Sequence, residues 1–159
     1  MATYRKILVP LDGSELAECA LAHAIEIAKA FSAEVVLVSV TETKQGFRVV
    51  NDFSKSSEQR LIPEGTGKLE KQAQNYLAKI VKRITTEGVM VSTDVEYGNP
   101  ADGILASAQL YNCDLIVMSS HGRSGPSKWT HGSVAEKIFR ASTVPVLMVR
   151  APNCAPVSD

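Results

Sequence analysis

The clearest indication of fold class in this sequence is Lys6-Ile7-Leu8-Val9-Pro10-Leu11-Asp12-Gly13-Ser14. No polar residue interrupts the run from Ile7 to Leu11, which is typical of a strand buried on both faces of a parallel sheet. Asp12 and Gly13 end the run, and Ser14 is placed to cap a helix. From Ser14 to Phe31, polar and apolar residues fall on opposite arcs at about 100° per residue. The stretch therefore predicts a buried strand, a turn and an amphipathic helix that packs on the sheet.

The alternation of strand and helix continues along the chain. Further strand-like runs lie at Glu34–Val40, Met90–Tyr97, Asp114–Met118 and Val144–Val149, and helical patterns lie at Leu69–Ile84, Asn99–Asn112 and from Ser133 onward. This alternation favours parallel βαβ units, and right-handed crossovers make the first and fourth strands natural neighbours. We therefore expect an α/β fold with an open parallel sheet and helices on both faces. The segment from Thr41 to Ile62 is predicted to be a long, polar and irregular loop.

Length and charge narrow the classes of function. The 159 residues suit one domain, and we expect a core over residues 4–150 with a loose tail at 151–159. Lys and Arg number 17 and Asp and Glu number 17, with no basic run, so nothing favours binding to nucleic acid or to an anionic membrane. No segment approaches the ~18 consecutive apolar residues of a membrane span.

The cysteines and the start of the chain bear on the compartment. Cys19, Cys113 and Cys154 share no metal-ligand spacing and are interpreted as free thiols of a reducing compartment. The first residues lack the charged and apolar pattern of a signal peptide. We expect a cytoplasmic protein.

Two polar segments indicate where a ligand would bind. Ligands of open parallel sheets lie outside the carboxyl ends of the strands, where the strand order reverses. The segments that leave the first and fourth strands are Asp12-Gly13-Ser14 and Ser119 to Ser133, and both are rich in small, turn-forming residues. This coincidence is the main functional signal of the sequence.

The second segment suits a phosphate group. Gly122 and Gly125 let backbone N–H groups approach an anion closely, and Gly132-Ser133 opens a helix whose N-terminus favours negative charge. Arg123 and Lys128 can add cationic contacts.

Simpler interpretations stay open for two of these positions. Ser133 with Glu136 is fully explained as a capping box, although a cap and an anion can share one turn. Asp12 is placed to accept hydrogen bonds from a ribose or an adenine amine, or it is an Asx-turn residue with no ligand.

Other catalytic and binding motifs are missing. The sequence holds no Walker A loop, no Gly-x-Gly-x-x-Gly and no Gly-x-Ser-x-Gly. His121 and His131 lack a clear third metal ligand nearby. We therefore assign no catalytic residue and no protein-held metal.

Several of these stretches together resemble one known family. Lys6 to Ser14, followed by an alanine-rich helix, resembles the opening of universal stress proteins, and Asn99-Pro100 after Gly98 is similar to the entry of their third helix. Their C-terminal signature is matched by Ser120-His121-Gly122-Arg123-Ser124-Gly125, Gly132-Ser133-Val134-Ala135-Glu136-Lys137-Ile138 and Val144-Pro145-Val146-Leu147-Met148-Val149. The likeness runs from about Tyr4 to Arg150, nearly the whole chain. It implies a single universal stress protein domain over 1–159, with a five-stranded parallel sheet of order 3-2-1-4-5.

The resemblance also implies a ligand. The ATP-binding branch of that family carries Gly-x2-Gly-x9-Gly-[Ser/Thr], which Gly122 and Gly132-Ser133 match, while Ser119 stands at the first glycine. A Cβ at that position is expected to weaken or adjust binding of the nucleotide rather than abolish it. The ligand implied is ATP, ADP or AMP, with any Mg²⁺ or Mn²⁺ held mainly by phosphate oxygens and water. The residues implied around it are Pro10, Asp12, Val40, Met118, Ser119, His121, Gly122, Gly132, Ser133 and Val134.

Three functions remain open, and a homodimer is expected for each of them. The first is a regulatory stress-response module in which the bound nucleotide alters the Thr41–Ile62 loop or the dimer surface, and an unknown protein partner reads that state. The second is a slow ATPase or phosphotransferase, for which no convincing base is present. The third is a nucleotide-free scaffold in which Ser119 closes the site.

The resemblance implies a homodimer through the last strand, Val146 to Val149, which is apolar and would lie at a sheet edge.

Overall fold

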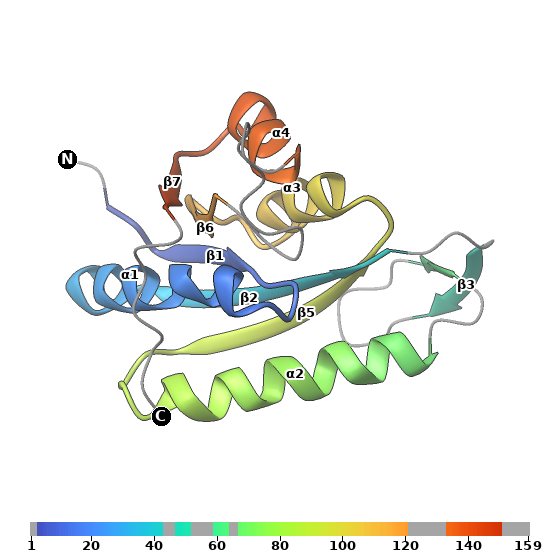
Figure 1. Cartoon of the computed structure of the whole chain (residues 1–159), viewed down its shortest axis with the longest axis horizontal. Coiled ribbons are helices and arrows are strands. Elements are labelled where there is room, and N and C mark those ends of the chain that lie inside the picture. The colour runs from blue at the N-terminus through green and yellow to red at the C-terminus, as the bar shows by residue number, and fades with distance from the viewer. Residues whose placement is uncertain (1–2, 43–46, 52–58, 64–66, 121–132, 151–159) are drawn as a thin grey trace.

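One parallel sheet forms the centre of the protein. The computed structural model describes residues 3–42, 47–51, 59–63, 67–120 and 133–150. The sheet contains β1 (Lys6–Pro10), β2 (Glu34–Thr41), β5 (Val91–Tyr97), β6 (Leu115–Ser119) and β7 (Val146–Val149), in the order β5-β2-β1-β6-β7 (Figure 1). Every pairing between these strands is parallel. In chain order this is 3-2-1-4-5, so the predicted fold is confirmed.

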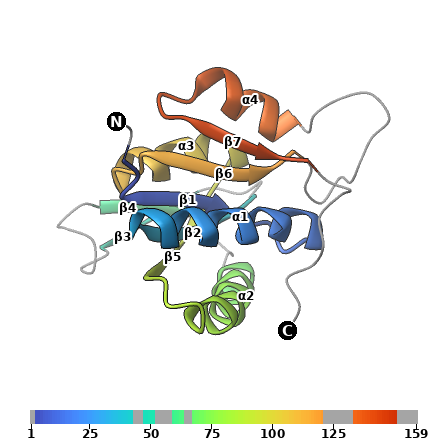
Figure 2. The same cartoon turned by 90° about the vertical axis from the view of Figure 1, so that its left-hand side faces the viewer.

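The helices form a layer on each face of the sheet. Helices α1 (Glu15–Phe31) and α2 (Gly67–Thr85) lie on one face, and α3 (Pro100–Leu110) and α4 (Ser133–Ala141) lie on the other (Figure 2). Alternate residues of the central strands enter opposite cores: Ile7 and Val9 pack with α1 and α2, whereas Leu8 packs with α3 and α4. The strands are therefore buried on both faces, as their apolar runs predicted.

Helix starts follow the predicted capping residues. The Ser14 hydroxyl accepts a hydrogen bond from the Ala17 N–H at 3.2 Å, and this bond caps α1. The Asn99 side chain accepts from the N–H groups of Ala101 and Asp102, and Pro100 occupies the first turn of α3. Both caps satisfy N–H groups that have no partner within the helix.

The segment between β2 and α2 differs from the prediction of an irregular loop. It contains an antiparallel hairpin of β3 (Phe47–Asn51) and β4 (Gln59–Pro63), which lies beyond the carboxyl end of β2. The prediction is wrong for the nine positions of this hairpin that lie between Thr41 and Ile62. Each strand has only five residues, and no two-residue turn of the Asn-Gly type joins them, so the usual sequence signal of a hairpin is missing.

The cysteines also differ from prediction. Cys19 is disulfide-bonded, with its partner outside the described residues, so the expectation of free thiols is wrong at this position. Pairing depends on which cysteines the fold brings together, and spacing along the sequence does not reveal it. Cys113 is a free thiol, and its burial raises its pKa to about 11.

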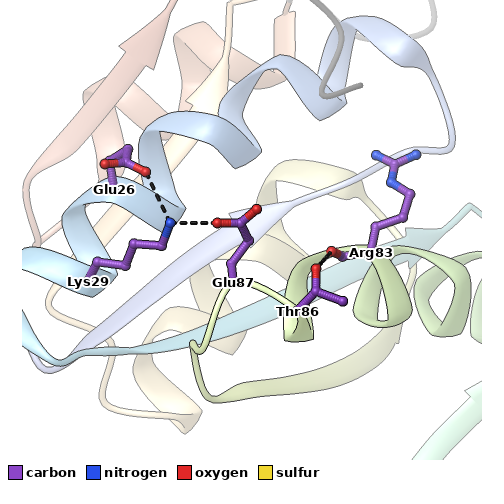
Figure 3. Close-up of polar contacts among 5 residues, drawn as sticks. All are labelled: Glu26, Lys29, Arg83, Thr86 and Glu87. Carbon is purple, nitrogen blue, oxygen red and sulfur yellow. Dashed lines mark hydrogen bonds and ion pairs between the residues drawn. The ribbon is translucent and has the colours of Figure 1, made fainter. Parts of the chain in front are cut away.

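Charged and polar side chains join α1 to α2. Glu18 accepts hydrogen bonds from the Tyr76 hydroxyl at 3.0 Å and from Arg83 at 2.7 Å. Burial, with the nearby Glu18 carboxylate as a further cause, raises the pKa of Tyr76 well above its usual value. At the other end of α1, Lys29 Nζ lies 2.6 Å from a Glu87 oxygen and 3.3 Å from a Glu26 oxygen, as Figure 3 shows (Figure 3).

The turn after α2 is held by its own hydrogen bond. The Thr86 hydroxyl donates to the Arg83 carbonyl at 2.8 Å, which satisfies a carbonyl in the last turn of the helix. Lys29 contacts Glu87 one residue later, so this turn is connected to α1 as well.

We expect Glu18→Ala to lower the free energy of unfolding by about 1–3 kcal/mol, because it leaves two partly buried donors without their acceptor. Urea denaturation measures the change. Glu26→Ala is the matched control, since the Glu26 side chain is 75% exposed and its pair with Lys29 is a surface contact. Equal effects of the two variants would contradict the role given to Glu18.

Candidate functional site

The candidate site lies where the strand order reverses. β1 pairs with β2 on one side and with β6 on the other, and the chain reaches β6 only after completing β2 and β5. The carboxyl ends of β1, β2 and β6 therefore meet at one edge of the sheet. This arrangement brings together segments that the sequence singled out separately.

The segment after β1 is held in a tight turn. Asp12 Oδ1 accepts hydrogen bonds from the Ser14 N–H at 2.9 Å and from the Ser14 hydroxyl at 2.5 Å. Gly13 between them has φ +86°, a conformation that favours glycine. The Leu11 N–H donates to the Val38 carbonyl at 2.8 Å and fixes the start of the turn against β2. The Asp12 side chain thus forms an Asx turn with Ser14, and the half-buried carboxylate is held at the N-terminus of α1.

Three apolar site residues contact the same core. Val40 near the end of β2, Met118 in β6 and Val134 in α4 belong to, or pack against, the core beneath α3 and α4. Met118 is 5% exposed, whereas Val40 and Val134 are half-buried. Pro10 ends β1, is buried and is paired with Val38 of β2. Pro10, Val40 and Met118 are thus apolar residues at the carboxyl ends of three neighbouring strands.

Ser119 is a buried polar residue at the end of β6. It is 6% exposed and lies in register with Val149 of β7. The next residue, Ser120, donates its N–H to the Val149 carbonyl at 2.9 Å. The backbone at the position of the first motif glycine is therefore fixed by its pairing with β7.

The other predicted site residues lie wholly or partly outside the residues that the structure describes. His121, Gly122, Arg123 and Gly132 lie outside the described residues. Ser133 opens α4, as predicted, and its side chain is also outside the description. The structure thus brings Pro10, Asp12, Val40, Met118, Ser119 and the start of α4 to one edge of the sheet.

Gly103 is a neighbour of the site that sequence reasoning did not identify. It lies in α3 and is buried against Val40. The available signal was a glycine inside a helical pattern, which commonly has a packing reason. Within the described ranges, no group of three or more His, Cys, Asp or Glu side chains is arranged to hold a metal ion.

Residues 3–150 match the model of the universal stress protein family. The chain belongs to this family. Universal stress protein MJ0531 of Methanocaldococcus jannaschii is 35% identical over 150 residues, which cover 94% of this chain and 84% of that protein. Universal stress protein YxiE of Bacillus subtilis is 32% identical and is covered to 99%, with 92% of this chain aligned. The predicted family is thereby confirmed.

Solved structures of the family share the fold. The structure of MJ0577 from M. jannaschii superimposes with a TM-score of 0.78 at 30% identity and covers 96% of this chain and 99% of its own. A universal stress protein crystallised in complex with cAMP has a TM-score of 0.66 at 21% identity and covers 94% of this chain and 98% of its own. At that lower identity the likeness concerns the fold alone.

As for membranes, none of the helices in the described ranges of this universal stress protein has the length and apolar character needed to cross one.

Proposed function

We propose that this universal stress protein binds an adenine nucleotide and acts as a regulatory module of a stress response. One observation carries the proposal: an anchored carboxylate, Asp12, and the apolar residues Val40 and Met118 lie at the edge where the strand order reverses. An apolar surface with a few fixed polar groups is what a nucleoside requires.

Each part of the site has a role in this proposal. Pro10, Val40 and Met118 line the base, and Asp12 accepts hydrogen bonds from the ribose or the adenine amine. The segment that contains His121, Gly122, Arg123 and Gly132 surrounds the phosphates, together with Ser133 and Val134 at the start of α4. An N-terminus of that kind favours anions through its free N–H groups. Mg²⁺ or Mn²⁺ would be held through phosphate oxygens and water.

The relatives support the ligand class. The universal stress protein crystallised with cAMP holds a ligand with an adenine, a ribose and a phosphate, and its fold is the fold of this chain. ATP, ADP and AMP contain the same three parts, so a site of this shape supports them equally. We propose ATP as the ligand to test first, because the phosphate-binding segment extends over residues 119–133.

Regulation is favoured over catalysis. Phosphoryl transfer requires a positioned base or nucleophile in addition to charge stabilisation. The carboxylate described at the site, Asp12, is already bonded to Ser14 and lies at the nucleoside end rather than beside the phosphates in this proposal. We therefore propose at most weak hydrolysis, and a nucleotide-free scaffold is the competing function if Ser119 closes the site.

We further propose a homodimer that pairs through β7. This strand is at the edge of the sheet, and the carbonyls of Pro145 and Val149 bond to β6. Because backbone groups alternate in direction along a parallel strand, those of Val146 and Met148 face away from β6. An apolar edge with outward-facing groups is a template for a second chain.

Isothermal titration of ligand-stripped protein with ATP and Mg²⁺ tests the proposed function. We expect micromolar affinity, and we expect Ser119→Gly to bind ATP at least as tightly as the native protein. Absence of binding up to millimolar ATP in the native protein would contradict the proposal. If Ser119→Gly alone then bound ATP, the scaffold function would be supported, with Ser119 as the residue that closes the site.

A further inference from the structure

Gly103 occupies a position in α3 where glycine has no conformational advantage. A glycine inside a helix destabilises the helix relative to alanine. A Cβ added at Gly103 would lie 3.0 Å from each methyl carbon of Val40 and 3.4 Å from Cβ of Glu96. By contrast, a Cβ at Gly67, at the start of α2, would meet nothing within 4 Å. Gly103 is therefore present because α3 lies in direct contact with Val40.

Neither of the two backbones at this contact is free to move apart. Val40 lies near the end of β2, where it is paired with Glu96 of β5; the pairing of β2 with β1 ends two residues earlier, at Val38. The Gly103 N–H donates to the Asn99 carbonyl at 2.9 Å, and the buried side chains of Ala101 and Ile104 hold α3 on the core. The group that can yield is the Val40 isopropyl, and a β-branched side chain has few alternative rotamers.

From this packing we infer that Gly103 is a positioning residue for the nucleotide base and acts through Val40. This inference rests on the proposed function, in which Val40 lines the base. Because α3 occupies one side of the isopropyl group, a methyl at position 103 displaces the Val40 methyls from the position in which, in this proposal, they line the base. The absence of a side chain at Gly103 thus sets the position of the Val40 methyls at the end of β2.

The role predicts a selective loss of affinity. Gly103→Ala should weaken ATP binding about threefold, as expected for a contact that must shift by a few tenths of an ångström in a packed site. Tripolyphosphate has no base and should bind as it does to the native protein. A general disturbance of the fold would weaken both ligands together. Gly67→Ala is the matched control and should leave both affinities unchanged.

A double variant separates the contact from an effect on folding. In Val40→Ala the two methyl carbons are absent, so adding Gly103→Ala should cause no further loss of ATP affinity. This comparison also applies if Gly103→Ala alone does not fold. The native protein, the two single variants Gly103→Ala and Val40→Ala and the double variant are each titrated with ATP and with tripolyphosphate. Circular dichroism verifies that each of them is folded.

The outcomes are distinct. An ATP-specific loss in Gly103→Ala that disappears in the Val40→Ala background supports the inference. Native-like ATP affinity in Gly103→Ala, an equal loss for tripolyphosphate, or a loss that persists without the Val40 methyls overturns it while leaving the proposed function intact. Failure of the native protein to bind ATP overturns the proposed function and this inference with it.

Discussion

Asp12→Ala is expected to lower ATP affinity by about 10- to 100-fold, the effect of losing charge-assisted hydrogen bonds to a ligand. In the structure one carboxylate oxygen is fixed by the N–H and the hydroxyl of Ser14, so the side chain has a defined orientation before a ligand arrives. A group that is already ordered loses little entropy on binding. Isothermal titration with ATP and Mg²⁺ measures the change.

Asp12→Ala also removes the two hydrogen bonds that Asp12 accepts from Ser14, and these bonds stabilise the start of α1. A loss of affinity in this variant therefore has two candidate causes. Ser14→Ala is the control. It removes the hydrogen bond from the Ser14 hydroxyl to Asp12 and the cap on the Ala17 N–H, and it leaves the Asp12 carboxylate in place. We expect it to reduce stability by about 1 kcal/mol and to leave ATP affinity within about threefold of native. If both variants lose affinity equally, Asp12 acts only through the turn, and its assignment as a nucleotide ligand is wrong.

The predictable part of the fold was the part determined by local chemistry. The apolar run before Asp12 predicts a strand buried on both faces, and β1 is that strand. The Asn99-Pro100 pair predicts a capped helix start, and α3 begins there. The carboxyl ends of β1 and β6 meet because right-handed crossovers leave few alternatives. For these elements the local pattern and the global arrangement agree, as is usual in a foldable sequence.

The parts that could not be predicted depend on contacts between distant residues. The hairpin of β3 and β4 has short strands whose pairing forms only in three dimensions, and the disulfide at Cys19 depends on which cysteine the fold brings near it. Gly103 belongs to the same class. A glycine inside a helical pattern indicates a packing contact, but only the folded structure shows that the contact is with Val40 on another element.

Leu147→Lys is expected to convert the proposed dimer into a monomer at micromolar protein concentration, with a rise of at least about tenfold in the dimer dissociation constant. The Leu147 side chain is 38% exposed on the edge strand, so a lysine there can remain in water in the monomer. In a two-fold antiparallel pairing of β7 with its copy, each chain contributes the same surface. Two added ammonium groups are then brought together and partly desolvated.

The substitution tests the strand edge rather than the stability of the sheet. The carbonyls of Pro145 and Val149 bond to β6, and by alternation the backbone of Leu147 faces β6 as well, so the outward-facing groups of Val146 and Met148 are unchanged. Leu69→Lys is the matched control, because Leu69 is 46% exposed on α2. Sedimentation velocity over a range of concentrations distinguishes the cases. A Leu147→Lys protein that sediments as a dimer would place the interface elsewhere, and loss of the dimer in both variants would show that added charge on any face disrupts it. Dissociation of Leu147→Lys alone is the result that the edge-strand interface requires.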